Sequence, residues 1–377
     1  MHRNEEFMKR IAFFSGDITR GGGTERVGTL VANALSKETG YQVYFISLTH
    51  KSTEPAYEIA PEITRSCFSK KWINPGPGYL PVIFKLIRYI RRNKIDILID
   101  IDGVLDILSI PAKWITKVKL VSWEHFYFYN EMGTSYRKII RKMAARYADA
   151  IVTLTEQDKG FYQENLKIRG RIQAIHNPAD YMQPQNDVPE RNYENKIILS
   201  VGRLCEAKAF ERIPQIAAGI KNNYPELSFQ WLIAGEGELR AQIEEQIRRW
   251  DVEKEVTLLG HVSELGALYG EALVYVMTSR YEGLPMVLLE AKMHRLPCVS
   301  FDIMTGPSEI IQDGIDGYLV SSPENENCAA EKMAHGIARL LTDHELYQKF
   351  SNHTQDNLGA FRMDAVKSCW KELLEQL

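Results

Sequence analysis

The sequence of 377 residues lacks several features that would assign it to a special class of protein. Its five cysteines are an odd number, widely separated and without paired metal-ligand spacing, so we interpret them as free thiols in a reducing compartment. No apolar run reaches the roughly 18 residues needed to span a bilayer. Charged residues interrupt the N-terminal segment, which therefore does not resemble a secretion signal. These absences predict a cytoplasmic protein, or one bound peripherally to the inner leaflet of the cytoplasmic membrane.

What is present is typical of a globular chain of two domains. The composition is 45% hydrophobic and 25% charged, and the length suits two domains of about 150–200 residues each. The small net charge is unevenly spread, because residues 1–190 carry +6 and the remainder −9. Either the basic half binds an anionic surface or the asymmetry is chance. No feature indicates nucleic-acid binding.

Short apolar segments with strand character alternate with helical patterns, which predicts doubly wound α/β folding with parallel sheets. A polar, proline-bearing stretch at 181–190 separates two such series and is typical of a linker. We therefore predict an N-terminal domain over 1–185 and a C-terminal domain over 186–359. The predicted strands are 9–15, 43–47, 95–100, 118–121 and 150–154 in the first domain, then 197–201, 229–234, 256–259, 274–278 and 298–301 in the second.

The most informative motif lies at 280–291, where two carboxylates, Glu282 and Glu290, are eight residues apart. Proline favours the first helical position, so we expect a helix to begin at Pro285 with its free amides directed at the preceding loop. One carboxylate would then lie level with a bound phosphate and the other about 7 Å further along. That spacing suits a nucleotide-sugar. The alternative is a solvated helix with two ordinary surface glutamates.

Five further motifs follow predicted strands, where open α/β sheets place their binding loops. They are Gly21–Val27, Ser200–Leu204 with Lys208 beyond it, Ile233–Gly237, Leu259–Val262 and Gly306–Ile311. With the Glu282 motif, their order and spacing resemble those of retaining glycosyltransferases of family 4. The resemblance is strongest over residues 196–320. It implies the GT-B fold, in which two Rossmann-like domains face a central cleft and a C-terminal helix, here about 360–377, packs back on the first domain.

The resemblance also implies roles for individual residues. Donor-binding positions would be Gly22, Gly23, Arg203, Lys208, Val262, Glu282, Gly283, Leu284, Pro285 and Glu290. Catalysis would involve His125, Glu282, Arg203 and Lys208, and acceptor contacts would come from Thr24, Glu25, Arg26 and Asp102. No metal or cofactor is implied beyond the nucleotide-sugar co-substrate. A UDP-sugar is expected, although the motifs leave UDP against GDP undecided.

Several of these roles have a chemical reason, and some of the same residues also have a simpler interpretation. Without a metal, fixed cations such as Arg203 and Lys208 must stabilise the departing nucleoside diphosphate, although they could be solvated surface charges. Glu290 would accept both ribose hydroxyls, and Glu282 would contact the transferred sugar. His125 follows a strand and lies among aromatic residues, where histidines are more often packed than catalytic. The family usually has glycine after the lysine, whereas this chain has Ala209.

The implied activity is retaining transfer of a hexose or N-acetylhexosamine to a glycan or polyprenyl-diphosphate-linked oligosaccharide in surface polysaccharide synthesis. A non-catalytic nucleotide-sugar binding protein is one alternative. Another is a glycogen-synthase-like or sucrose-type enzyme, whose longer N-terminal segments are missing here. A third is a haloacid-dehalogenase-type phosphatase using Asp100 and Asp102, but no later acidic pair closes a metal site.

Two segments of the first half combine apolar and basic residues. Residues 79–94 carry five basic side chains and no acid, and 136–143 repeat this character. A basic amphipathic helix lies naturally on an anionic leaflet. The simpler alternative is that the apolar face only packs on its own sheet.

Overall fold

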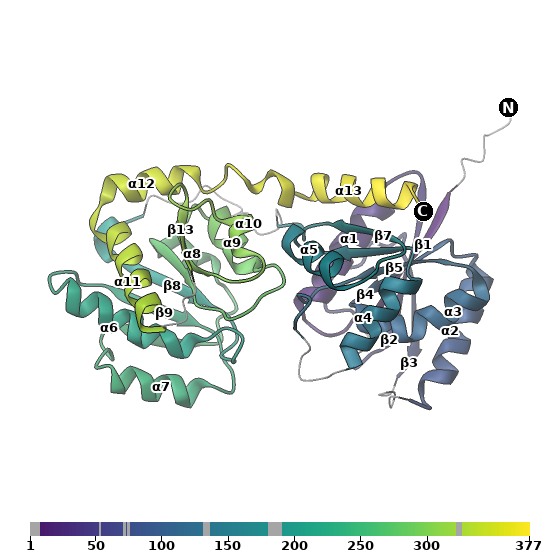
Figure 1. Cartoon of the computed structure of the whole chain (residues 1–377), viewed down its shortest axis with the longest axis horizontal. Helices are drawn as coiled ribbons and strands as arrows, with labels where there is room; N and C mark the ends of the chain where they lie inside the picture. Colours follow the sequence, from purple (N-terminus) through teal and green to yellow (C-terminus); the bar gives the residue numbers. More distant parts are fainter. Residues whose placement is uncertain are drawn as a thin grey trace. The chain divides into compact units, whose positions relative to one another are not determined.

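The computed structural model describes residues 8–52, 54–70, 73, 76–130, 136–179, 191–321 and 326–377. The chain divides into two compact units, one formed by residues 1–178 with 361–377 and the other by 179–360 (Figure 1). The predicted linker at 181–190 lies outside the described residues. Within those residues, no helix is both long enough and apolar enough to cross a membrane.

The first unit is built on a parallel seven-stranded sheet in the order β3-β2-β1-β4-β5-β6-β7. Its central strands are almost fully buried, because helices cover both faces of a parallel sheet. The strands are β1 (Lys9–Asp17), β2 (Tyr41–Thr49), β3 (Thr64–Ser69), β4 (Ile97–Ile101), β5 (Lys119–Trp123), β6 (Ala150–Thr153) and β7 (Arg171–Ala174).

The connecting helices of this unit follow the strands in chain order. They are α1 (Gly23–Ser36), α2 (Tyr79–Asn93), α3 (Asp106–Thr116) after the short turn η1 (Gly103–Leu105), α4 (Tyr136–Tyr147) and α5 (Glu156–Asn165). Buried residues of α2, α3, α4 and α5 share one apolar cluster with the sheet.

The second unit repeats this plan on a parallel six-stranded sheet ordered β10-β9-β8-β11-β12-β13. Its strands are β8 (Ile197–Val201), β9 (Gln230–Ala234), β10 (Val256–Gly260), β11 (Val274–Met277), β12 (Cys298–Asp302) and β13 (Gly317–Ser321). Its helices are η3 (Tyr193–Asn195), η4 (Phe210–Arg212), α6 (Ile213–Asn223), α7 (Arg240–Arg249), α8 (Gly266–Glu271), α9 (Met286–Met293), α10 (Pro307–Ile310), α11 (Glu326–Thr342) and α12 (His344–His353).

The C-terminal helix α13 (Met363–Glu375), which follows η5 (Leu358–Phe361), belongs to the first unit. Glu38 at the end of α1 accepts from Lys371 at 2.5 Å and from Lys367 at 3.0 Å. The ring of Trp370 packs edge-on against Trp123 at a centroid distance of 4.7 Å. The helix is thus held by an apolar contact and by ion pairs.

The predicted fold class is confirmed, and each predicted strand is present within a few residues of its expected bounds. Three strands were not predicted: β3, β7 and β13. They form an outer edge of their sheet, and β3 and β7 are mostly half-buried or exposed, so their sequences lack the apolar run that marks the central strands.

Candidate active site

Two loops at the carboxyl ends of β8 and β9 approach each other closely in the second unit. A Cβ atom added at Gly235, whose φ is +151°, would lie 1.8 Å from the carbonyl oxygen of Gly202. Any side chain at position 235 would therefore separate the loops. Beside them lies a cavity of about 320 Å³, lined by Val201, Gly202, Arg203, Ala234, Gly235, Glu236, His261, Val262 and Leu265.

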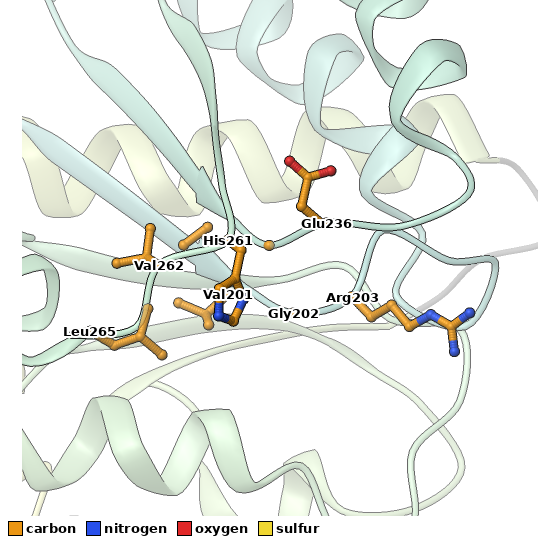
Figure 2. Close-up of a pocket in the computed structure, with 9 residues that line it drawn as sticks. Val201, Gly202, Arg203, Glu236, His261, Val262 and Leu265 are labelled. Atoms are coloured by element: carbon orange, nitrogen blue, oxygen red, sulfur yellow. The ribbon is translucent and has the colours of Figure 1, made fainter. Parts of the chain in front are cut away.

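The cavity combines apolar walls with a few polar groups. Figure 2 shows Val262 and Leu265, which follow β10, together on one side, while Arg203, which follows β8, extends on the opposite side. Glu236 is held by Arg240, whose Nη1 lies 2.7 Å from Glu236 Oε1. Pockets for small molecules and cofactors typically have this combination. Arg203 and Val262, both expected from the sequence to bind the donor, line one cavity.

Lys208 and Glu282 form an ion pair next to this cavity. Lys208 Nζ lies 2.6 Å from Glu282 Oε1, and their side chains are 22% and 13% exposed. Ser279 Oγ donates to the same carboxylate oxygen at 2.6 Å. A Cβ placed at Gly202 would be 3.5 Å from Lys208 Cδ and Cε, so the lysine stem lies against the cavity wall. The structure therefore brings together two residues that are 74 positions apart in the chain.

Ala209 replaces the glycine that the family usually has after this lysine. Its backbone lies in the left-handed region, with φ +52° and ψ +38°, and the Ala209 carbonyl accepts from Arg212 N at 3.1 Å. Alanine therefore adopts the conformation for which glycine is the usual choice, at a cost of about 1 kcal/mol. The loop that presents Lys208 is formed despite the substitution.

The turn before α10 holds the loop between Glu282 and α9 in place. Thr305 Oγ1 donates to the Glu282 carbonyl at 2.5 Å. At Gly306, with φ +101°, an added Cβ would meet Pro285 Cδ at 2.3 Å. Pro285 is the N-cap of α9 and Met286 its first residue, one position later than expected, and the Pro285 carbonyl accepts from Leu288 N. Gly283 and Leu284 lie in this anchored loop.

Glu290 lies in α9 and receives a hydrogen bond of 2.9 Å from the hydroxyl of Tyr269. Neither Tyr269 nor Ser279 was singled out from the sequence. Ser279 precedes Glu282 by only three residues, so its position was a usable signal. The contact of Tyr269 with Glu290 depends on how α8 packs on α9, and no local pattern predicts it.

Arg203 is the most open of the expected donor-site cations. Its side chain is 72% exposed and pairs with Glu238, itself 54% exposed, at 3.0 Å. Exposed ion pairs of this kind contribute about 0–1 kcal/mol, so the guanidinium can leave Glu238 for a ligand at little cost.

In the first unit, His125 is buried after β5. Its ring packs on Trp123 at a centroid distance of 4.6 Å. Burial lowers the pKa of His125 to about 4, so the ring is neutral near pH 7. Among the described residues, its Nε2 has no hydrogen-bond partner. A neutral imidazole with an unused nitrogen suits either packing or contact with a ligand.

The glycine loop at the start of α1 encloses Glu25. The Glu25 side chain is 3% exposed and accepts from Arg20 at 2.5 Å. A Cβ at Gly22 would lie 2.4 Å from Glu25 Oε2, so this glycine leaves room for the carboxylate. Thr24 is half-buried, and Gly23 and Arg26 are exposed. The exposed residues at the start of α1, rather than buried Glu25, are the ones open to a ligand.

Asp102 lies beyond β4 with an unusual φ of +84°. Arg137 donates two hydrogen bonds to its carboxylate, to Oδ1 at 3.1 Å and to Oδ2 at 2.9 Å. Asp100 is fully buried, accepts from Ser109 at 2.8 Å, and burial raises its pKa to about 7. Within the described part of the chain, no group of three His, Cys, Asp or Glu side chains could hold a metal. This arrangement does not match the paired metal-binding aspartates of a phosphatase.

Comparison with known families identifies the chain. Residues 21–182 match the model described as Glycosyltransferase Family 4, and residues 183–357 match Glycosyl transferases group 1. An uncharacterized glycosyltransferase of Haemophilus influenzae is 30% identical over 97% of this chain and 100% of its own length. The chain belongs to the group 1 glycosyltransferases. The phosphatase alternative is therefore set aside.

Two other relatives of this glycosyltransferase have informative names. The amylovoran biosynthesis glycosyltransferase AmsD of Erwinia amylovora is 29% identical, over 97% of this chain and 100% of its own. The GalNAc-alpha-(1->4)-GalNAc-alpha-(1->3)-diNAcBac-PP-undecaprenol alpha-1,4-N-acetyl-D-galactosaminyltransferase of Campylobacter jejuni is 26% identical, over 98% and 99%.

Solved structures agree on the GT-B fold. Sucrose-phosphate synthase from Thermosynechococcus elongatus superposes with a TM-score of 0.78 at 18% identity, covering 98% of both chains. Anabaena HepE in complex with UDP gives 0.75 at 17% identity, over 98% of this chain and 100% of its own.

Proposed function

We propose that this glycosyltransferase transfers a hexose or N-acetylhexosamine, with retention of configuration, from a UDP-sugar to a glycan or polyprenyl-diphosphate-linked oligosaccharide. The process served would be bacterial surface polysaccharide synthesis. The observation that carries the proposal is the Lys208–Glu282 pair, held against the wall of the Val201–Leu265 cavity. The names of the Erwinia and Campylobacter relatives support the acceptor class.

Each part of a nucleotide-sugar has a counterpart in the second unit. The apolar walls at Val262 and Leu265 suit a nucleobase, and Glu290 offers a carboxylate to the ribose hydroxyls. Lys208 and Arg203 supply positive charge for the diphosphate. As the glycosidic bond breaks, negative charge grows on the departing phosphate, and fixed cations stabilise it most at that moment. On this reasoning the reaction needs no metal.

Glu282 would contact the hydroxyls of the transferred sugar rather than act as a nucleophile. Lys208 and Ser279 already direct two hydrogen bonds at its Oε1. An anionic carboxylate so engaged is a good acceptor through its other oxygen. Retention is supported by the family resemblance and by the alpha linkage in the name of the Campylobacter relative.

Thermal stability with candidate donors tests the proposal. A ligand that binds only the folded state increases the free energy of unfolding, by about 2.7 kcal/mol at 100 times its Kd, and so raises the melting temperature. We expect UDP-sugars to stabilise the protein more than GDP-sugars, and the product of transfer to show the donor's anomeric configuration by NMR. Stabilisation without transfer or hydrolysis would support the non-catalytic binding protein instead. Inversion would contradict retention.

We further propose that the first unit contacts an anionic lipid surface through α2 and its neighbours. Four α2 residues pack inward, but Leu80 and Phe84 remain 60% and 68% exposed. Packing on the sheet therefore explains only part of the apolar character of α2. Ile139 of α4 is 61% exposed, and the α3 residues Trp114 and Ile115 are about half exposed.

Basic side chains accompany these exposed apolar ones. Arg88, Arg91 and Arg92 are exposed on α2, which has no acidic residue. Each basic residue near an anionic leaflet contributes about 1 kcal/mol to binding. Co-sedimentation with vesicles containing anionic lipid should fall at high salt and be lost when all three arginines become glutamate. The matched control changes Arg248 and Arg249 of α7 to glutamate. Equal binding to neutral vesicles would contradict the proposal.

A further inference from the structure

Tyr269 is the side chain that holds Glu290 in place, although it lies outside the recognised motifs. It is fully buried, and its hydroxyl donates to Glu290 Oε2 at 2.9 Å. Burial raises the pKa of Tyr269 well above its usual value, so the hydroxyl remains a donor throughout the physiological range. Because a carboxylate has two oxygens, this bond uses Oε2 and fixes the direction in which Oε1 points.

The ring of Tyr269 packs against two other rings. It stacks on His294 at a centroid distance of 5.0 Å with 22° between the planes, and on Tyr275 at 6.0 Å with 25°. His294 Nδ1 lies 2.9 Å from the Glu290 carbonyl. A carbonyl only accepts, so His294 Nδ1 carries the hydrogen. Glu290 therefore orients the His294 ring through its carbonyl, while its carboxylate accepts from Tyr269.

Arg191 ties this cluster together from the backbone side. It is the first residue of the second unit that the structure describes after Ala179. Its Nη2 donates to the Tyr269 carbonyl at 3.1 Å and also to the His294 carbonyl. These carbonyls lie at the C-terminal ends of α8 and α9, where the helix dipole favours a cation. One guanidinium therefore links α8 to α9.

We propose that Tyr269 is a positioning residue for donor binding, acting through Glu290, and that Arg191 and His294 hold Tyr269 in register. The inference rests on the proposed role of Glu290 as the ligand of the donor ribose. A carboxylate already fixed in one rotamer loses no conformational freedom when the nucleotide binds. The smaller entropy loss increases donor affinity, because ordering a flexible side chain opposes association. It is the same for the bound donor and for the transition state, so it should not change kcat.

The test is a comparison of donor affinity in Tyr269→Phe and Tyr193→Phe. Both variants lose one tyrosine hydroxyl bond of 2.9 Å in the same unit, but that of Tyr193 goes to the Leu340 carbonyl. For Tyr269→Phe we expect the Kd and KM for the UDP-sugar to rise about 2- to 10-fold, which matches a net hydrogen bond of about 0.5–1.5 kcal/mol, with kcat little changed. Tyr193→Phe should lower the melting temperature without affecting donor affinity.

A double-mutant cycle decides whether Tyr269 acts through Glu290. In a Glu290→Ala background, Tyr269→Phe should have no further effect on UDP binding, because the carboxylate that it positions is absent. Additive losses would overturn the inference, as would unchanged donor affinity in a folded Tyr269→Phe protein. If the parent protein binds no nucleotide-sugar, the proposed function fails instead. A parent that binds UDP-sugar while Tyr269→Phe binds it equally well contradicts only the role of Tyr269.

Discussion

Replacing Lys208 by alanine is the most direct test of how the reaction is promoted. The lysine Nζ is 2.6 Å from Glu282 Oε1 and its side chain is only 22% exposed, so no solvent ion readily replaces it. On the proposed mechanism, its charge matters most when the nucleoside diphosphate departs. Removing one preorganised group that stabilises developing negative charge typically costs about 2.7–4 kcal/mol, or 100- to 1,000-fold in kcat. We expect a loss of that size in kcat, with a smaller rise in KM.

The assay is steady-state release of nucleoside diphosphate, with single-turnover measurements to separate chemistry from product release. Lys221→Ala is the matched control, because Lys221 also forms ion pairs in this unit, with Asp251 and Glu255, but lies at the surface. It should leave both constants unchanged. A Lys208→Ala enzyme with normal kcat and only a raised KM would show that the lysine binds ground state and transition state equally, and the reasoning would be wrong.

Three other predictions follow from the same geometry. Glu290→Gln should weaken UDP binding by about 1–3 kcal/mol in titration calorimetry, because a charged acceptor becomes neutral, and parental affinity would refute the ribose assignment. EDTA or added magnesium should change turnover little, whereas a strict metal requirement abolished by Asp100→Asn would show that the aspartates bind metal. Between the usual pKa of 3.8 and the folded value of about 7, folded Asp100 binds a proton that the unfolded chain lacks. Stability relative to Asp100→Asn should therefore fall as pH rises through this window, by at most about 1.4 kcal/mol per unit in urea denaturation, and a rise would contradict the buried, protonated state.

The sequence was most informative where a buried strand ends in a loop with distinctive residues. β8 has its predicted bounds of Ile197–Val201, and the residues after it, Gly202 and Arg203, line the cavity. Edge strands such as β3 were missed, because a strand with one free edge and exposed side chains needs no apolar run. The pattern detects a run of apolar residues, whether the strand is central, such as β8, or at an edge, such as β10.

The contacts within the site were less predictable than its members. Lys208 and Glu282 were each expected to bind the donor, but their direct ion pair depends on β8 lying next to β11, which periodicity does not specify. The ion pair of Arg137 with Asp102 was also missed, because the segment 136–143 was considered only for its apolar and basic character, as a helix that lies on a membrane or packs on its own sheet. One helix can present exposed residues such as Ile139 outward and still direct Arg137 at the sheet.

The two units differ in how their polar groups can be tested. The second unit carries its donor-site candidates, Arg203, Lys208 and Glu290, on loops or a short helix, each with a side-chain partner. Single substitutions there should lower activity more than stability. In the first unit, Glu124 and Arg141 are 4% and 3% exposed and pair at 3.4 Å.

Breaking a buried pair such as Glu124–Arg141 costs about 3–5 kcal/mol, because the remaining charge stays buried. Loss of activity after such a change would reflect unfolding rather than loss of the acceptor. The proposed acceptor contacts are therefore better examined at exposed or half-buried positions in the first turn of α1, Arg26 and Thr24. There a changed acceptor KM at constant melting temperature distinguishes a contact from a structural role.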